Sequence, residues 1–253
     1  MKKILVAPLA AALCLAAPAV HAAPHAPAPH QDWSFDGPLG RFDMAAVQRG
    51  YAVYAQVCSA CHSMNAVTYG DLGAMGLTDE QVRQIAAAQS VPGGVDAQGE
   101  PVTRPATAAD HFRNPFPSPE AAAAANNGTP PPDQSRLALV YTGGPDRIYA
   151  LLTGYRTPPA GYRPSHPGAF YNPYAADGEI SMPPPLHDGL VDYADGTPAT
   201  TAQEARDVTT FLAWVAQPHL AERHRLGIQV TLYLLFLAVL AFLLKRRIWS
   251  DVH

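Results

Sequence analysis

The stretch "VCSACHSM", residues 57–64, places two cysteines three positions apart and a histidine directly after the second. A redox dithiol, half of a zinc site and a haem attachment point can all begin this way. C-x-x-C-H is the signature of c-type haem attachment, in which both sulfurs bond to the porphyrin vinyl groups. The histidine then lies where it can ligate the iron from one side. The stretch therefore predicts covalent haem on Cys58 and Cys61, with His62 as an axial ligand.

The two other kinds of site need features that the rest of the chain does not offer. A thioredoxin-like dithiol needs a βαβ setting, and strand-like runs of Val, Ile and Thr are almost absent. A structural zinc site needs about four ligands. The histidines between the motif and the apolar run at residue 226 are scattered and never fall at ligand spacing: His111, His166, His187, His219 and His224. One covalently bound haem c is the interpretation that needs the fewest further residues.

The N-terminus has the pattern of an export signal. Residues 1–22 combine a cationic start, an apolar run and small residues before a cleavage point after Ala22. The alternative is a retained membrane anchor, but the run is short and is interrupted by Pro8 and Pro18. We therefore expect a cleaved signal peptide, which would leave Cys58 and Cys61 as the cysteines of the mature chain.

The C-terminus carries a second apolar run, residues 226–244, which contains no charged side chain. It is long enough to cross the hydrocarbon core as a helix. A buried core helix is the alternative, but this run is apolar on every face and ends at Lys245, Arg246 and Arg247. Positive charge favours the cytoplasmic side. We expect one anchor in a bacterial inner (cell) membrane, a tail at 245–253 in the cytoplasm and a head in the periplasm.

The region between these segments is predicted to be mainly α-helical. We expect a lead-in over residues 23–40 and a head over 41–222. One helix should begin after Asp43 as N-cap and run into the haem motif. Another should begin at Asp146 and end at Gly154.

A further helix should follow the capping box of Thr201 and Glu204 and stop at Pro218. Residues 90–135 are too rich in proline for long helices or central strands, and we expect irregular loops around the porphyrin, with a flexible linker as the alternative. The predicted fold is a class-I-like c-type cytochrome head with long proline-rich loops and one C-terminal transmembrane helix.

The second axial ligand is expected from a loop far along the chain. The methionines beyond the leader are Met44, Met64, Met75 and Met182. Met182 stands in "EISMPPPLHDG", where three prolines stiffen the backbone after it. His166 and His187 are rival ligands, and a gap-filling core residue is the alternative role for Met182. Histidine–methionine ligation raises the potential above that of two nitrogen ligands and closes the iron to dioxygen.

Several longer motifs carry a family resemblance: "WSFDGPLGRFD", "RGYAVYAQVCSACHSM", "NPFPSPEAAAAANNGTPPPD", "ALLTGY", "FYNPY", "ISMPPPL" and "DGTPATTAQEARDVTTFLAW". From about Trp33 onward the chain resembles cytochrome c1, the haem subunit of ubiquinol–cytochrome c oxidoreductase (the cytochrome bc1 complex). The resemblance implies that Cys58 and Cys61 form the thioethers, that His62 is the proximal ligand and that Met182 is the distal one.

The same resemblance implies an electron-transfer subunit that is not an enzyme by itself. Its electron would come from an iron–sulfur (Rieske) protein, beside a cytochrome b, and pass to a soluble cytochrome c. One position departs from the family, which usually has an arginine near a haem propionate where this chain has Tyr141. Arg136 and Arg104 are candidates to replace it. Alternatives are another membrane-anchored cytochrome c (an oxidase subunit or a free-standing carrier) and a haem peroxidase.

Charge limits the partners of the head. The chain has a formal charge of −4, and setting aside +2 from residues 1–22 and +2 from residues 245–253 leaves −8, without a single lysine. Such a domain is a poor partner for nucleic acid or an anionic membrane surface and a good one for a cationic protein. Acidic residues gather on either side of Met182: Asp177, Glu179, Asp188, Asp192 and Asp195. They predict docking of a cationic soluble cytochrome c, with a solvated acidic surface that only keeps the head soluble as the alternative.

Overall fold

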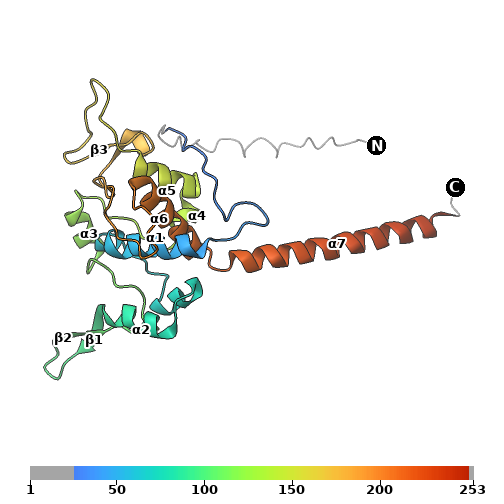
Figure 1. Ribbon diagram of the computed structural model, residues 1–253, viewed down its shortest axis with the longest axis horizontal. Helices are drawn as coiled ribbons and strands as arrows, with labels where there is room; N and C mark the ends of the chain where they lie inside the picture. The colour runs from blue at the N-terminus through green and yellow to red at the C-terminus, as the bar shows by residue number, and fades with distance from the viewer. Residues whose placement is uncertain (1–25, 251–253) are drawn as a thin grey trace, which may run out of the picture.

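The computed structural model describes residues 26–250, so the predicted signal peptide and residues 251–253 lie outside the described residues. A head of short helices and long loops carries one long helix that projects away from it (Figure 1). The helices are α1 (Met44–Gln56), α2 (Asp79–Ala87), α3 (Pro119–Ala125), α4 (Leu137–Val140), α5 (Gly144–Thr153), α6 (Thr201–Ala216) and α7 (Leu220–Ile248), with 3-10 turns η1 (Cys58–Ala60), η2 (Tyr69–Met75) and η3 (Ala176–Gly178). The predicted mainly α fold is confirmed.

The core is built where α1 crosses α6, and α5 packs against α6 beside them. Asp43 caps α1 as predicted, accepting from the Ala45 amide at 3.0 Å. The two helices approach closely at Gly50, where a Cβ atom would collide with the Asp207 carbonyl and the Phe211 side chain. Only glycine fits such a contact.

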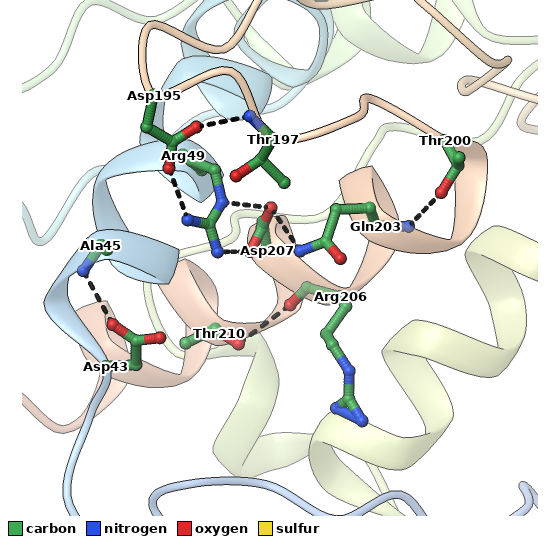
Figure 2. Close-up of polar contacts among 10 residues, drawn as sticks. All are labelled: Asp43, Ala45, Arg49, Asp195, Thr197, Thr200, Gln203, Arg206, Asp207 and Thr210. Atoms are coloured by element: carbon green, nitrogen blue, oxygen red, sulfur yellow. Dashed lines mark hydrogen bonds and ion pairs between the residues drawn. The ribbon is translucent and has the colours of Figure 1, made fainter.

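A charged clasp lies beside this crossing (Figure 2). The Arg49 guanidinium donates to both carboxylate oxygens of Asp207, at 2.9 and 3.0 Å, and to Asp195 at 2.8 Å. Gln203 donates a further hydrogen bond to Asp207 at 2.9 Å. Because Asp207 is fully buried, its charge has to be balanced by a partner inside the head, and Arg49 provides the opposite charge.

The capping box predicted for α6 is wrong by one residue. Thr200 is the N-cap and accepts from the Gln203 amide at 3.2 Å. Thr201 instead donates from its amide and its hydroxyl to Asp188, both at 2.7 Å. Glu204 is buried, and its Oε1 accepts from two loop amides at 3.1 Å, Leu190 and Val191. The loop that contains Asp188, Leu190 and Val191 thus binds the polar groups of Thr201 and Glu204 that a capping box would have paired within the helix.

Asp146 also has a different role from the predicted one. Helix α5 begins at Gly144 after a left-handed Gly143 (φ 92°), which serves as N-cap. The Asp146 carboxylate accepts from the Trp33 indole at 2.6 Å and from the Gln31 amide at 3.1 Å. Trp33 is buried in the core, so packing of the head extends N-terminal of the expected boundary at residue 41. The end of α5 at Gly154 is as predicted.

The proline-rich middle holds one short hairpin among its irregular loops. Strands β1 (Ser90–Val95) and β2 (Pro101–Pro105) pair antiparallel, with an irregularity between Pro92 and Gly94. Proline is tolerated here because each strand of a two-stranded hairpin is an edge strand. The pairing was not predicted. A second small sheet joins β3 (Phe170–Tyr171) to β4 (Glu179–Ile180).

Helix α7 contains the predicted membrane segment but begins before it. Among residues 26–250 it is the helix long and apolar enough to cross a membrane, and its side chains from Leu226 onward are mostly exposed. Its first turns belong to the head: Leu220 is buried in the core, and the His224 ring lies 3.1 Å from the Gly40 carbonyl. Head and helix are therefore joined by packing as well as by the chain.

Candidate haem site

The cysteines and histidine of the motif lie on one turn at the end of α1. The amides of Cys61 and His62 donate to the Cys58 carbonyl at 3.1 and 2.9 Å. Cys58 is half-buried and Cys61 is exposed, and both are free thiols. Burial, and then the neighbouring Cys61, raise the pKa of the Cys58 thiol to about 12. A redox dithiol needs the opposite shift, so Cys58 presents a neutral sulfur beside the imidazole.

The imidazole of His62 is held by the proline-rich middle. Its Nδ1 lies 2.9 Å from the Pro132 carbonyl. A carbonyl can only accept, so Nδ1 carries the proton and Nε2 keeps a lone pair for a metal. Burial lowers the pKa of His62, which favours the neutral ring that metals bind. This is the arrangement expected of an axial histidine with a fixed orientation.

The segment that supplies the Pro132 carbonyl is itself fastened to the motif. Asp133 accepts from the Ser63 hydroxyl and the Asn65 amide, both at 2.8 Å. The Gln134 amide donates to the Ser63 carbonyl at 2.9 Å. Burial opposes ionisation of Asp133, but its hydrogen bonds outweigh burial and lower its pKa. This segment is recognisable in the sequence as a motif, but its contact with His62 was not predicted.

The described residues do not offer a polydentate site for a bare metal ion. Within residues 26–250, no group of three or more His, Cys, Asp or Glu side chains is placed to hold one. The cysteine pair therefore lacks the partners of a zinc site among those residues, whereas the donor set of two thiols and one imidazole suits a haem. The site residues fit that group.

Met182 lies on a separate loop, just after β4. Its side chain is half-buried, and its carbonyl accepts from the Tyr155 hydroxyl at 3.0 Å. Met64 and Met75 are core residues, 0% and 1% exposed, and Met44 is exposed on α1. None of the contacts described among residues 26–250 joins Met182 to His62: Cys58, Cys61 and His62 lie on one turn, and Met182 lies on a separate loop.

The rival histidines are engaged or exposed. Each ring nitrogen of His166 lies 3.1 Å from a serine hydroxyl, Nδ1 from Ser165 and Nε2 from Ser181. His187 is exposed, and its Nδ1 lies 3.2 Å from the Asp188 carbonyl. Both ring nitrogens of His166 are thus engaged, whereas the contact of His187 involves Nδ1 and not Nε2, so His187 stays a rival of Met182.

A cavity of about 570 Å³ adjoins the Met182 loop and is lined by aromatic and proline side chains, including Tyr155, Tyr162, Tyr171 and Pro184. A smaller one, of about 200 Å³, opens beside Cys61 and is lined in part by Phe116 and Pro131. Proline-rich loops thus form a wall at each of the two loops that carry the predicted ligands.

The position of Tyr141 is half-buried at the end of α4. Of the two arginines considered in its place, Arg104 is bound to Asp110 through both terminal nitrogens, at 2.7 and 2.6 Å. Arg136 is exposed at the start of α4. Arg136 is therefore the one of the two whose guanidinium is not already paired with a carboxylate in a described contact.

Comparisons with known proteins find relatives that match most of the chain. The model of the Cytochrome C1 family matches residues 33–252. Cytochrome c1 of Rhodospirillum rubrum is 42% identical over 88% of this chain and 87% of that protein. The mitochondrial cytochrome c1 haem protein of Kluyveromyces lactis is 45% identical over 94% and 82%. A protein of Bradyrhizobium diazoefficiens named cytochrome b/c1 is 39% identical over 89% of this chain and 36% of its own length. The chain belongs to the cytochrome c1 family.

Proposed function

We propose that this chain holds one covalent haem c and carries electrons from an iron–sulfur (Rieske) protein to a soluble cytochrome c. Cys58 and Cys61 form the two thioethers, and His62 and Met182 are the axial ligands. The observation that carries the proposal is the neutral imidazole of His62, oriented by the Pro132 carbonyl beside both thiols.

Family membership gives the coarser function. Cytochrome c1 is a haem-binding electron-transfer subunit of the bc1 complex and not an enzyme by itself. A cytochrome b and a Rieske subunit are therefore expected beside it. The relative named cytochrome b/c1 supports a close association with cytochrome b.

When bound, the haem supplies the one-electron couple, and the residues of the chain fix its setting. The hydrogen bond from His62 to Pro132 holds the ring plane and makes the imidazole a better donor. Met182 as second ligand keeps dioxygen away and raises the potential relative to two nitrogen ligands. The prolines in the loops beside both ligands fix the backbone φ angle and so limit rearrangement during electron transfer.

The membrane arrangement follows from α7. One apolar C-terminal helix fits a single-pass anchor. The cationic cluster Lys245, Arg246 and Arg247 in its last turn favours the cytoplasmic side for that end. We place the head in the periplasm of a bacterial cell, in keeping with the export signal predicted over residues 1–22.

The acidic residues near Met182 divide into two kinds. Three have partners within the head: Glu179 accepts from the Ser165 amide and the Tyr162 hydroxyl, Asp188 from Thr201, and Asp195 from Arg49. Asp177 and Asp192 are exposed. Of the three partnered carboxylates, only Asp195 is neutralised by a cation, Arg49. We assign attraction of the cationic acceptor mainly to Asp177 and Asp192, the exposed carboxylates whose oxygens no described hydrogen bond directs into the head.

A haem-stained denaturing gel and a pyridine haemochrome assay test the proposal. One haem per chain is expected, resistant to denaturation, and Cys58→Ala or Cys61→Ala should weaken or abolish the retained stain. Two haems per chain, or haem lost from the parent protein on denaturation, would contradict it. Co-purification with a cytochrome b separates this function from that of a free-standing anchored cytochrome.

A further inference from the structure

The backbone around Met182 has little main-chain support. Pairing in the second sheet ends at Ile180, which faces Phe170. The three residues after Met182 are prolines, which have no amide proton to donate. The hydrogen bond described at the Met182 backbone comes from a side chain, the Tyr155 hydroxyl at 3.0 Å.

Tyr155 and the Met182 loop extend from two elements that are locked together. Asn172 follows β3, is completely buried and donates from its side chain to the Leu151 carbonyl of α5 at 2.8 Å. Its amide donates to the Gly178 carbonyl on the other side of the hairpin at 2.9 Å. A Cβ atom on Gly154 would collide with the Asn172 and Tyr174 side chains. The end of α5 is thus seated directly on the hairpin that leads to Met182.

We propose that Tyr155 is a positioning residue for the distal ligand: its hydroxyl fixes the Met182 carbonyl and so holds the thioether at its station. The proposal rests on the proposed role of Met182 as an iron ligand. The motifs "ALLTGY", "FYNPY" and "ISMPPPL" come together here. They supply, in that order, the hydrogen-bond donor Tyr155, the residue Asn172 that holds the hairpin to α5, and the proposed ligand Met182.

The hydrogen bond acts on the equilibrium between methionine bound to the iron and methionine released from it. One neutral hydrogen bond contributes about 0.5–1.5 kcal/mol, which is roughly a 2- to 10-fold change in an equilibrium constant. Because carbon monoxide competes with the thioether for reduced iron, its apparent affinity should rise by a factor in that range when the hydroxyl is removed.

The experiment compares Tyr155→Phe with Tyr171→Phe in the full-length chain within its membrane complex. Tyr171 lines the same cavity, and its hydroxyl has no described hydrogen bond to Met182, so the control removes the same atom nearby. Met182→Leu serves as the reference for a lost ligand. The readouts are carbon monoxide affinity of the reduced haem, the midpoint potential, and the red absorption band of the ferric haem–methionine bond.

Tyr155→Phe should bind carbon monoxide roughly 2- to 10-fold more tightly, with a lower potential and a weaker methionine band, while Tyr171→Phe should match the parent. Equal unfolding midpoints of the two variants check that packing is retained. If Met182→Leu opens the iron but both phenylalanine variants match the parent, the positioning role is overturned and the ligand stands. If Met182→Leu leaves the spectrum unchanged, the ligand assignment fails, and the positioning role with it.

Discussion

The guanidinium of Arg49 on α1 holds both carboxylate oxygens of Asp207 on α6, at 2.9 and 3.0 Å, directly beside the closest approach of the two helices. The Asp207 side chain is 1% exposed and that of Arg49 is 16% exposed. Two opposite charges thus neutralise each other beside the closest approach of α1 and α6. Asp207 depends on Arg49, because without it the carboxylate would be a buried charge with no cation described beside it, whereas Arg49 also pairs with Asp195.

Arg49→Met should therefore destabilise the head by about 3–5 kcal/mol, the usual effect of breaking a buried pair from one side. Denaturant unfolding followed by circular dichroism measures the change. Arg83→Met is the matched control, since Arg83 pairs with Glu80 at 2.7 Å on an exposed face of α2, and its loss should cost less than about 1 kcal/mol. Equal effects of the two substitutions would show that the clasp is not structural.

Glu204→Gln should stabilise the head increasingly as pH rises. Burial raises the pKa of Glu204 above 4.5, although the amides of Val191 and Leu190 oppose the shift. Because the folded-state pKa of Glu204 is raised, its contribution to the stability of the parent head is fully present below pH 4.5 and is lost as pH rises through that folded-state pKa. Glutamine keeps the acceptor oxygen without the charge. The free energy of unfolding, measured at pH 5 and pH 8, tests this.

Two controls accompany that measurement. Glu204→Leu removes the acceptor and should destabilise at both pH values, because the amides of Leu190 and Val191 then lose their partner. Glu100→Gln, on the exposed hairpin, should leave the pH dependence unchanged. A pH-independent effect of Glu204→Gln would mean that the buried carboxyl keeps an ordinary pKa.

Neutralising Asp177 and Asp192 together should reduce the salt dependence of electron transfer to a cationic cytochrome. Both are exposed on either side of the Met182 loop. Attraction between unlike charges weakens as the Debye length shrinks, so the parent rate should fall steeply with ionic strength and the variant rate less so. Stopped-flow reduction of the acceptor gives both slopes.

The hairpin provides the matched control for docking. Asp96→Asn with Glu100→Gln removes the same charge from an exposed tip of β1–β2, which lies at the opposite end of the head from β3 (Figure 1). This pair should leave the slope near that of the parent. If the two double variants lose the same salt dependence, the acceptor senses the total charge of the head rather than a docking surface.

Truncation should distinguish the anchor from the head. A chain ending at Leu226 keeps the buried Leu220 and the contact between His224 and Gly40, and it should give a soluble, folded, red head. A chain ending at Gln217 loses both and should unfold at a lower denaturant concentration. Membrane fractionation and denaturant unfolding of the two chains test this. A longer chain that stays in the membrane after high-salt washing would point to a further attachment.

What the sequence could predict depended on how local the cause was. Asp43 caps α1 through an amide two residues away, so the pattern sufficed. The cap of α6 was misplaced because Asp188, on a separate loop, binds both polar groups of Thr201. Asp146 likewise serves Trp33, which is remote in sequence.

The same division applies to the site. The cysteines and His62 fall on one turn, so their spacing was enough to group them. The Pro132 carbonyl and the Tyr155 hydroxyl reach their partners across long loops, and only the fold brings them together. Motif strings indicated that these segments mattered, but the contacts that give them a role depend on tertiary packing.

Because Leu220 is buried within the head, the rotation of α7 about its own axis is fixed relative to the head. Each residue added to a helix turns everything beyond it by about 100° and advances it by about 1.5 Å. Inserting one alanine between Leu226 and Gly227 would therefore rotate the head about the helix axis. Inserting seven would restore nearly the original orientation and place the head roughly 10 Å farther from the membrane. The number of residues in α7 thus sets both the orientation of the head about the membrane normal and its distance from the membrane.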